Sequence, residues 1–109
     1  MSTQPAIVIL CTAPAEGQHA ERLARGLVEA RLAACVNLLP NVRSFYAWQG
    51  ALHDDAEVQL VIKTRPEAFD KVEAWIHEHH PYEVPEVIAL PVTAVADPYA
   101  AWIASQVPA

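Results

Sequence analysis

Apolar and polar positions along the chain change their spacing several times, and each change predicts a new element. Residues 7–11 are a continuous, largely β-branched apolar run, which is typical of a central strand buried on both faces. From Ala20 to Val28, apolar residues recur at i, i+3, i+4, i+7 and i+8, a spacing that places them on one face of a helix. Pro14 suits the first turn of this helix, because its missing N–H costs nothing there. We therefore expect a strand followed directly by a helix that reaches Leu32.

The middle of the chain predicts a long strand with an irregularity in it. Residues 35–39 form a short apolar run, and residues 44–49 alternate with the period of two that marks a strand. Between them, Pro40 cannot donate to a strand ladder. We expect a bulge or kink at Pro40 and Asn41 within one long strand.

A second long strand and a second helix are predicted after a turn at Gly50. Residues 57–64 alternate, so that one side of this strand faces the core. Residues 64–67 have the capping-box pattern, in which the threonine hydroxyl accepts from the glutamate N–H and the glutamate carboxylate reaches back. The helix that follows should end near His79, because Pro81 forces the residue before it out of helical geometry.

The last part of the chain completes the expected fold. Residues 87–92 predict a final strand, which Pro91 places at a sheet edge. Asp97 and Pro98 predict the N-cap and first position of a short C-terminal helix. The order strand, helix, strand, strand, helix, strand is the split βαβ arrangement. We expect one domain, residues 1–109, with an α/β (α+β) ferredoxin-like sandwich, a long central hairpin and an extra C-terminal helix.

Composition excludes several classes of function. The formal charge is −6 and the seven Lys and Arg residues are scattered, whereas nucleic-acid binding needs a clustered basic surface. No apolar run approaches the roughly 18 residues of a membrane helix. Residues 1–5 do not resemble a secretory signal, so we expect a cytoplasmic protein with Cys11 and Cys35 as free thiols. Three glycines leave no phosphate-binding loop.

Aromatic residues on the hairpin indicate an interface. Tyr46 and Trp48 would lie on an overhanging part of it, and a contiguous exposed apolar patch usually marks a contact with another chain. Together with Tyr82 and Trp102 they could also stack a ligand, but interface aromatics are the commoner case. We therefore expect a homo-oligomer.

Seven separated segments resemble the CutA divalent-ion-tolerance family, in the same order and over nearly the whole chain. These segments are Cys11-Thr-Ala-Pro14, residues 31–37, Pro40 with Ser44, Tyr46, Trp48 and Gly50, Lys63-Thr64, residues 80–86, Pro91, and Tyr99 with Trp102-Ile103. The chain departs from the family pattern at Asn41, where glycine is common, and at Val95 or Ala96, where a turn glycine is usual. Asn41 is a mild change, since asparagine tolerates the left-handed region.

The resemblance implies a compact homotrimer that binds divalent cations, copper foremost, and contributes to metal tolerance without catalysing a reaction. It also implies metal ligands, which in this sequence are Cys11, His79 and His80. Thiolate and imidazole are ligands that copper and zinc favour, although Cys11 could equally be a small buried apolar residue. Glu83 and Glu86 are possible oxygen ligands.

Three other functions remain open from the sequence. A trimeric ferredoxin-like protein of the PII type would bind a small effector between subunits, which rests on fold analogy. An enzyme would use Cys11 as nucleophile with His79 or His80 as base. A stable scaffold for partner proteins is the last alternative.

Overall fold

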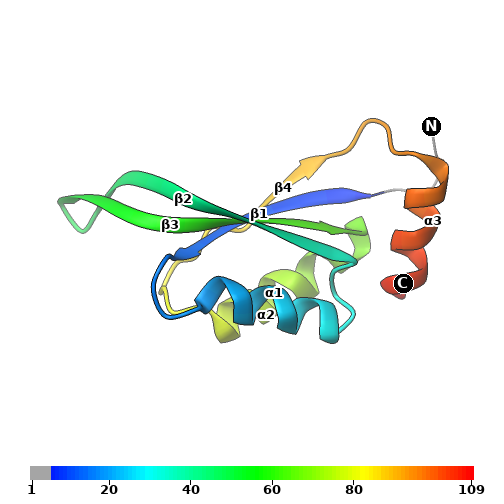
Figure 1. Ribbon diagram of the computed structural model, residues 1–109, viewed down its shortest axis with the longest axis horizontal. Coiled ribbons are helices and arrows are strands. Elements are labelled where there is room, and N and C mark those ends of the chain that lie inside the picture. The colour runs from blue at the N-terminus through cyan, green and yellow to red at the C-terminus, as the bar shows by residue number, and fades with distance from the viewer. Residues whose placement is uncertain (1–5) are drawn as a thin grey trace.

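The computed structural model describes residues 6–109, which form a ferredoxin-like α+β sandwich (Figure 1). The prediction that no secretory signal is present concerns residues 1–5, which lie outside the described residues. The elements in chain order are β1 (Ile7–Pro14), α1 (His19–Glu29), β2 (Cys35–Trp48), β3 (Ala51–Thr64), the 3₁₀ turn η1 (Pro66–Ala68), α2 (Phe69–His79), β4 (Ile88–Pro91) and α3 (Asp97–Gln106). The four strands pair in the order β2-β3-β1-β4, and each pairing is antiparallel. The predicted order of elements and the edge position of the last strand are both confirmed.

One face of the sheet is covered by α1 and α2 (Figure 1). The register places Ile9 opposite Ile62 and Cys11 opposite Leu60, so these four side chains point to the same face, where all are fully buried. The helices contribute their buried stripes to this core, namely Ala20, Leu23 and Leu27 from α1 and Val72 and Ile76 from α2. Burial of these apolar side chains is the main favourable term that holds the sandwich together.

The hairpin of β2 and β3 projects well beyond the helices (Figure 1). Its register shifts between Leu39 and Val42, and Asn41 adopts a φ of 66°. The predicted bulge is confirmed, and the left-handed conformation explains why asparagine is tolerated there. At the tip, Gln49 and Gly50 both have positive φ, as a tight two-residue hairpin turn requires.

The start of α1 differs from the sequence prediction. Pro14 is the last residue of β1 and lies opposite Glu57, so it is not part of the helix. The helix begins only at His19, after Gly17 and Gln18 have turned the chain with positive φ values of 87° and 58°. The strand therefore continues three residues beyond the apolar run that predicted it.

The predicted caps of α2 and α3 are also wrong. Thr64 does not form a capping box, because its hydroxyl donates to the carbonyl of Leu32 at 2.6 Å. Pro66 instead opens a 3₁₀ turn that leads into α2. Asp97 lies in the first turn of α3, whose N-cap is Ala96 without a side-chain hydrogen bond. A partner distant in sequence replaces the local one at Thr64, whereas Asp97 lies inside the helix that it was expected to cap.

Candidate functional site

A loop after α2 folds back across the sheet and is held there by two histidine contacts. His80 lies just past the end of α2 with an extended backbone, as Pro81 requires. Its Nε2 donates to the carbonyl of Thr12 at 2.7 Å, and its Nδ1 accepts from the N–H of Tyr82 at 3.0 Å. Since one ring nitrogen donates and the other accepts, the pair of contacts fits the neutral ring. Burial, the largest cause, lowers the pKa of His80 and favours the same state.

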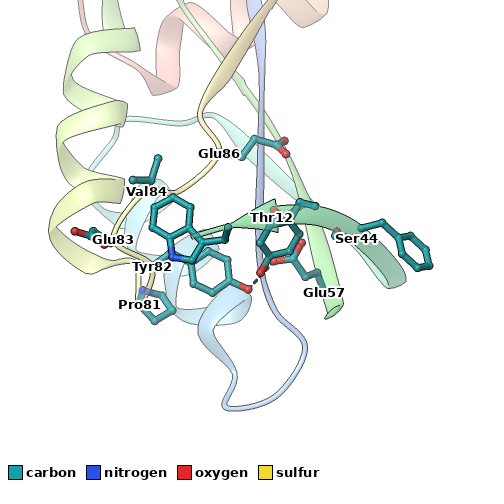
Figure 2. Close-up of a pocket in the computed structure, with 11 residues that line it drawn as sticks. Thr12, Ser44, Glu57, Pro81, Tyr82, Glu83, Val84 and Glu86 are labelled. Atoms are coloured by element: carbon teal, nitrogen blue, oxygen red, sulfur yellow. Dashed lines mark hydrogen bonds between the residues drawn. The ribbon is translucent and has the colours of Figure 1, made fainter. Parts of the chain in front are cut away.

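The loop and the projecting part of the hairpin border an open cavity of about 630 Å³, which we call the hairpin cavity (Figure 2). It is within the size range of small-molecule sites. Its lining residues are Thr12, Ser44, Phe45, Tyr46, Trp48, Glu57, Pro81, Tyr82, Glu83, Val84 and Glu86. In Figure 2 the Tyr82 ring points its hydroxyl at Glu57, to which it donates a hydrogen bond of 2.6 Å.

The hairpin cavity is acidic and carries no basic side chain among its lining residues. Glu57 is only 3% exposed although it lies on the sheet face away from the helices, because the loop covers it. Burial chiefly raises the pKa of Glu86, and the nearby Glu57 charge raises it further. Burial, followed by the hydrogen bond to Glu57, raises the pKa of Tyr82, which keeps its hydroxyl a donor.

Cys11 lies on the opposite face of β1, fully buried in the core under the helices. Burial is the main cause that raises the pKa of its thiol to about 12, and the negative charges of Glu86 and Glu57 add to it. The Sγ atom lies 3.7 Å from the Thr12 carbonyl, the same oxygen that accepts from His80. Cys11 and His80 therefore meet at one backbone carbonyl, but as neutral groups.

His79 is exposed and lines a second cavity, whose lining residues do not include its neighbour His80. Its Nδ1 donates to the Trp75 carbonyl at 2.8 Å and its ring stacks on Trp75, which leaves Nε2 as the unprotonated nitrogen of the neutral ring. With His19, Arg22, Leu23, Trp75 and Pro81 it lines a space of about 300 Å³ between α1 and α2. His19 accepts a hydrogen bond from Arg22 there, so a guanidinium charge lies at this site.

The three predicted metal ligands do not form a ready coordination site within the chain. Cys11 holds its proton, both nitrogens of His80 are occupied, and His79 lies in the second cavity. Within residues 6–109, no three His, Cys, Asp or Glu side chains form a group that could hold a metal ion. Both cysteines are free thiols, as expected. The same described part contains no helix long and apolar enough to cross a membrane.

Sequence reasoning did not foresee the role of Glu57 and assigned nothing to His19. Both are ordinary polar residues in an alternating strand or amphipathic helix, with no local signal of a site. Of the four aromatic residues that could stack a ligand, Tyr46, Trp48 and Tyr82 line the hairpin cavity, and Trp102 is not among its lining residues.

Comparison with known proteins gives a consistent result. A model of the CutA1 divalent ion tolerance protein family matches residues 7–106. The divalent-cation tolerance protein CutA of Pectobacterium atrosepticum is 44% identical over 106 residues, which cover 94% of this chain and 96% of the relative. The chloroplastic protein CutA of Arabidopsis thaliana is 41% identical over 101 residues, but the chain spans only 55% of that longer protein.

A solved structure agrees with the sequence comparison. The crystal structure of CutA1 from Oryza sativa superposes with a TM-score of 0.90 at 39% identity and covers 94% of each chain. The family match covers nearly the whole sandwich, including both cavities and the hairpin. The chain therefore belongs to the CutA1 divalent ion tolerance family.

Proposed function

We propose that this protein contributes to tolerance of divalent cations, copper foremost, as a non-enzymatic homotrimer in the cytoplasm. The observation that carries this proposal is the family match over residues 7–106, together with relatives named for divalent-cation tolerance. A non-enzymatic role is supported by Cys11, since a buried thiol with a pKa of about 12 is a poor nucleophile at neutral pH.

The proposed ligands are Cys11, His79 and His80. They differ in how readily each could bind a metal ion in the observed geometry. Only His79 offers a ring nitrogen without breaking a contact of the fold. Cys11 would have to lose its proton inside the core, and His80 would have to release either Thr12 or Tyr82. Binding through all three therefore requires a rearrangement of the loop after α2, or a contribution from another subunit.

Titration of the reduced protein with Cu²⁺ and Zn²⁺ by calorimetry tests this ligand set. We expect stoichiometric Cu²⁺ binding, and His79→Ala should weaken it most. Adding the Cys11→Ala and His80→Ala changes should weaken it further. His77→Ala is the matched control, because His77 is an exposed histidine of the same helix that contacts Glu73. Unchanged binding in the triple variant would show that the ligand set is wrong.

The homotrimer is supported by the uncovered face of the sheet. The register places Leu10 opposite Val61 and Ile88, on the face that α1 and α2 do not cover. Leu39, Ile88 and Leu90 are exposed apolar side chains of this face, and the hairpin adds Phe45 and Leu52. A patch of this kind on a small protein usually marks an interface.

A second function, a signalling module that binds a small effector between subunits, is favoured by one observation. The hairpin cavity is of ligand size and opens beside the uncovered face, where a second subunit would complete its wall. Metal ions and the effector would then be bound at different places in the same protein.

A further inference from the structure

The hairpin cavity has a buried carboxylate without a positive partner. Glu57 receives the Tyr82 hydroxyl at Oε2, and the salt bridges recorded among residues 6–109 join other groups. No buried side-chain oxygen in that part of the chain lacks a hydrogen-bond partner. Glu57 itself lines the cavity, so a ligand bound there can reach its carboxylate. A desolvated carboxylate is costly when unpaired, so a cation that enters the cavity is favoured.

Aromatic residues line the same cavity as this carboxylate, and one of them, Tyr82, contacts it directly. Tyr46, Trp48 and Tyr82 line the cavity from the hairpin on one side and the loop on the other. A cation placed over the face of such rings is attracted by their quadrupole, most strongly by tryptophan. The combination of carboxylate and ring faces suits a charged group that also has an apolar surface.

The lining distinguishes between classes of cation. A divalent metal ion needs several oxygen, nitrogen or sulfur ligands at once, and aromatic ring faces are not among them. Residues 6–109 hold no group of three suitable side chains. An anion is disfavoured by Glu57 and Glu86, which face the cavity without a basic residue. An alkylammonium group satisfies both the carboxylate and the rings.

We propose that the hairpin cavity binds a small organic ligand through an alkylammonium group, with Glu57 as its counter-ion and Tyr46 and Trp48 against its methylene groups. This inference rests on the effector-binding alternative above and gives that effector a chemical class. It does not depend on metal binding, because none of the three proposed metal ligands lines this cavity.

The test is a titration of the full-length ¹⁵N-labelled protein, followed by nuclear magnetic resonance, with butylammonium, butanol and butyrate in turn. The probes share a chain length and differ in charge. The protein has three tryptophans, and Trp48→Phe assigns the indole N–H signal that reports on the cavity. We expect saturable shifts of the Trp48 signal with butylammonium, at least about tenfold weaker binding of butanol, and none of butyrate.

Two cavity variants and two matched controls locate the site. Glu57→Gln keeps an acceptor for Tyr82 and removes the charge, and Trp48→Leu removes the ring; each should weaken butylammonium binding about tenfold. Glu73→Gln and Trp102→Ala change an exposed carboxylate and an exposed ring outside the cavity and should leave binding unchanged. If Glu57→Gln does not fold, Trp48→Leu on the exposed hairpin still provides the comparison.

Three outcomes would overturn the proposal. Equal affinity for butanol and butylammonium would show that the cavity binds apolar chains without selecting for positive charge. Butylammonium binding that persists in both cavity variants would place the site elsewhere. No shift of the Trp48 signal would show that the cavity is closed in the native protein, and a change of oligomer mass on Glu57→Gln would then identify a second copy as its occupant. Calorimetric metal titration of the same samples tests the metal-binding proposal independently of the result with butylammonium.

Discussion

The polar residues around β1 show how burial determines protonation. Cys11 and His80 both contact the Thr12 carbonyl, and both are kept neutral by a surrounding that disfavours charge. Their pKa values move in opposite directions because the thiol becomes charged by losing a proton and the imidazole by gaining one. Each shift has a measurable consequence.

Cys11 should be unreactive in the native protein. In a Cys35→Ala variant, where Cys11 is the remaining cysteine, we expect an aromatic disulfide reagent at about pH 8 to react only after denaturant is added, because the thiol is buried and its pKa is about 12. The Cys11→Ala variant is the control, since half-buried Cys35 should react faster in the folded state. Rapid native reaction of Cys11 would revive the nucleophile hypothesis.

His80 should make the fold sensitive to mild acid. Its pKa is lowered in the folded state, so the unfolded chain binds the proton more readily. Its contribution to stability is present above the ordinary histidine pKa of 6.5 and is lost as pH falls through the lowered folded value. We expect His80→Gln to reduce the dependence of the free energy of unfolding on pH between about pH 7 and pH 5, measured by urea denaturation. His77→Gln should retain the wild-type slope, and an equal slope in both variants would contradict this account.

At the scale of elements, the two helices approach each other through a glycine. A Cβ built on Gly26 of α1 would lie 2.3 and 2.4 Å from the Cζ2 and Cη2 atoms of Trp75 on α2. Gly26 has no positive φ, so contact rather than backbone conformation selects glycine here. The indole ring lies where a side chain of α1 would otherwise be.

Gly26→Ala should therefore destabilise the protein, although alanine normally stabilises a helix interior by about 1 kcal/mol over glycine. We expect a net loss of about 1–3 kcal/mol in the free energy of unfolding, because the ring must move in a packed contact. Urea denaturation of Gly26→Ala, Trp75→Leu and the double variant measures the coupling. The alanine should cost less in the Trp75→Leu background, and a gain of stability in the wild-type background would refute the steric argument.

Most of the fold could be predicted at this scale because periodicity is local. The apolar run of β1, the stripe of α1 and Pro40 each identify an element from neighbouring residues alone. The errors arose where a partner is distant in sequence, as when Thr64 donates to Leu32 instead of capping α2. The site was harder for the same reason, because Glu57 is buried by a loop about 25 residues later.

At the scale of the whole molecule, the sheet has one covered and one uncovered face. The molecule measures 45 × 25 × 22 Å, and its long dimension comes from the hairpin, which carries exposed Phe45 and Leu52 (Figure 1). A four-stranded sheet with helices on one side must bury its other face elsewhere if that face is apolar. Association of identical chains would bury it, and the hairpins would reach across to neighbouring subunits.

The proposed trimer is tested by two charge substitutions at equally exposed positions on opposite sides of the molecule. Leu90 of β4 is 41% exposed on the uncovered face, and Val28 of α1 is 43% exposed on the helical side. Leu90→Glu would bury a carboxylate in each subunit of the assembly, at a cost of at least about 1–3 kcal/mol for every copy. Sedimentation should show three chains for the wild type and for Val28→Glu, and dissociation at micromolar concentration for Leu90→Glu. A trimer that survives Leu90→Glu but dissociates with Val28→Glu would place the interface on the helices. In that case the apolar side of the sheet would need another partner.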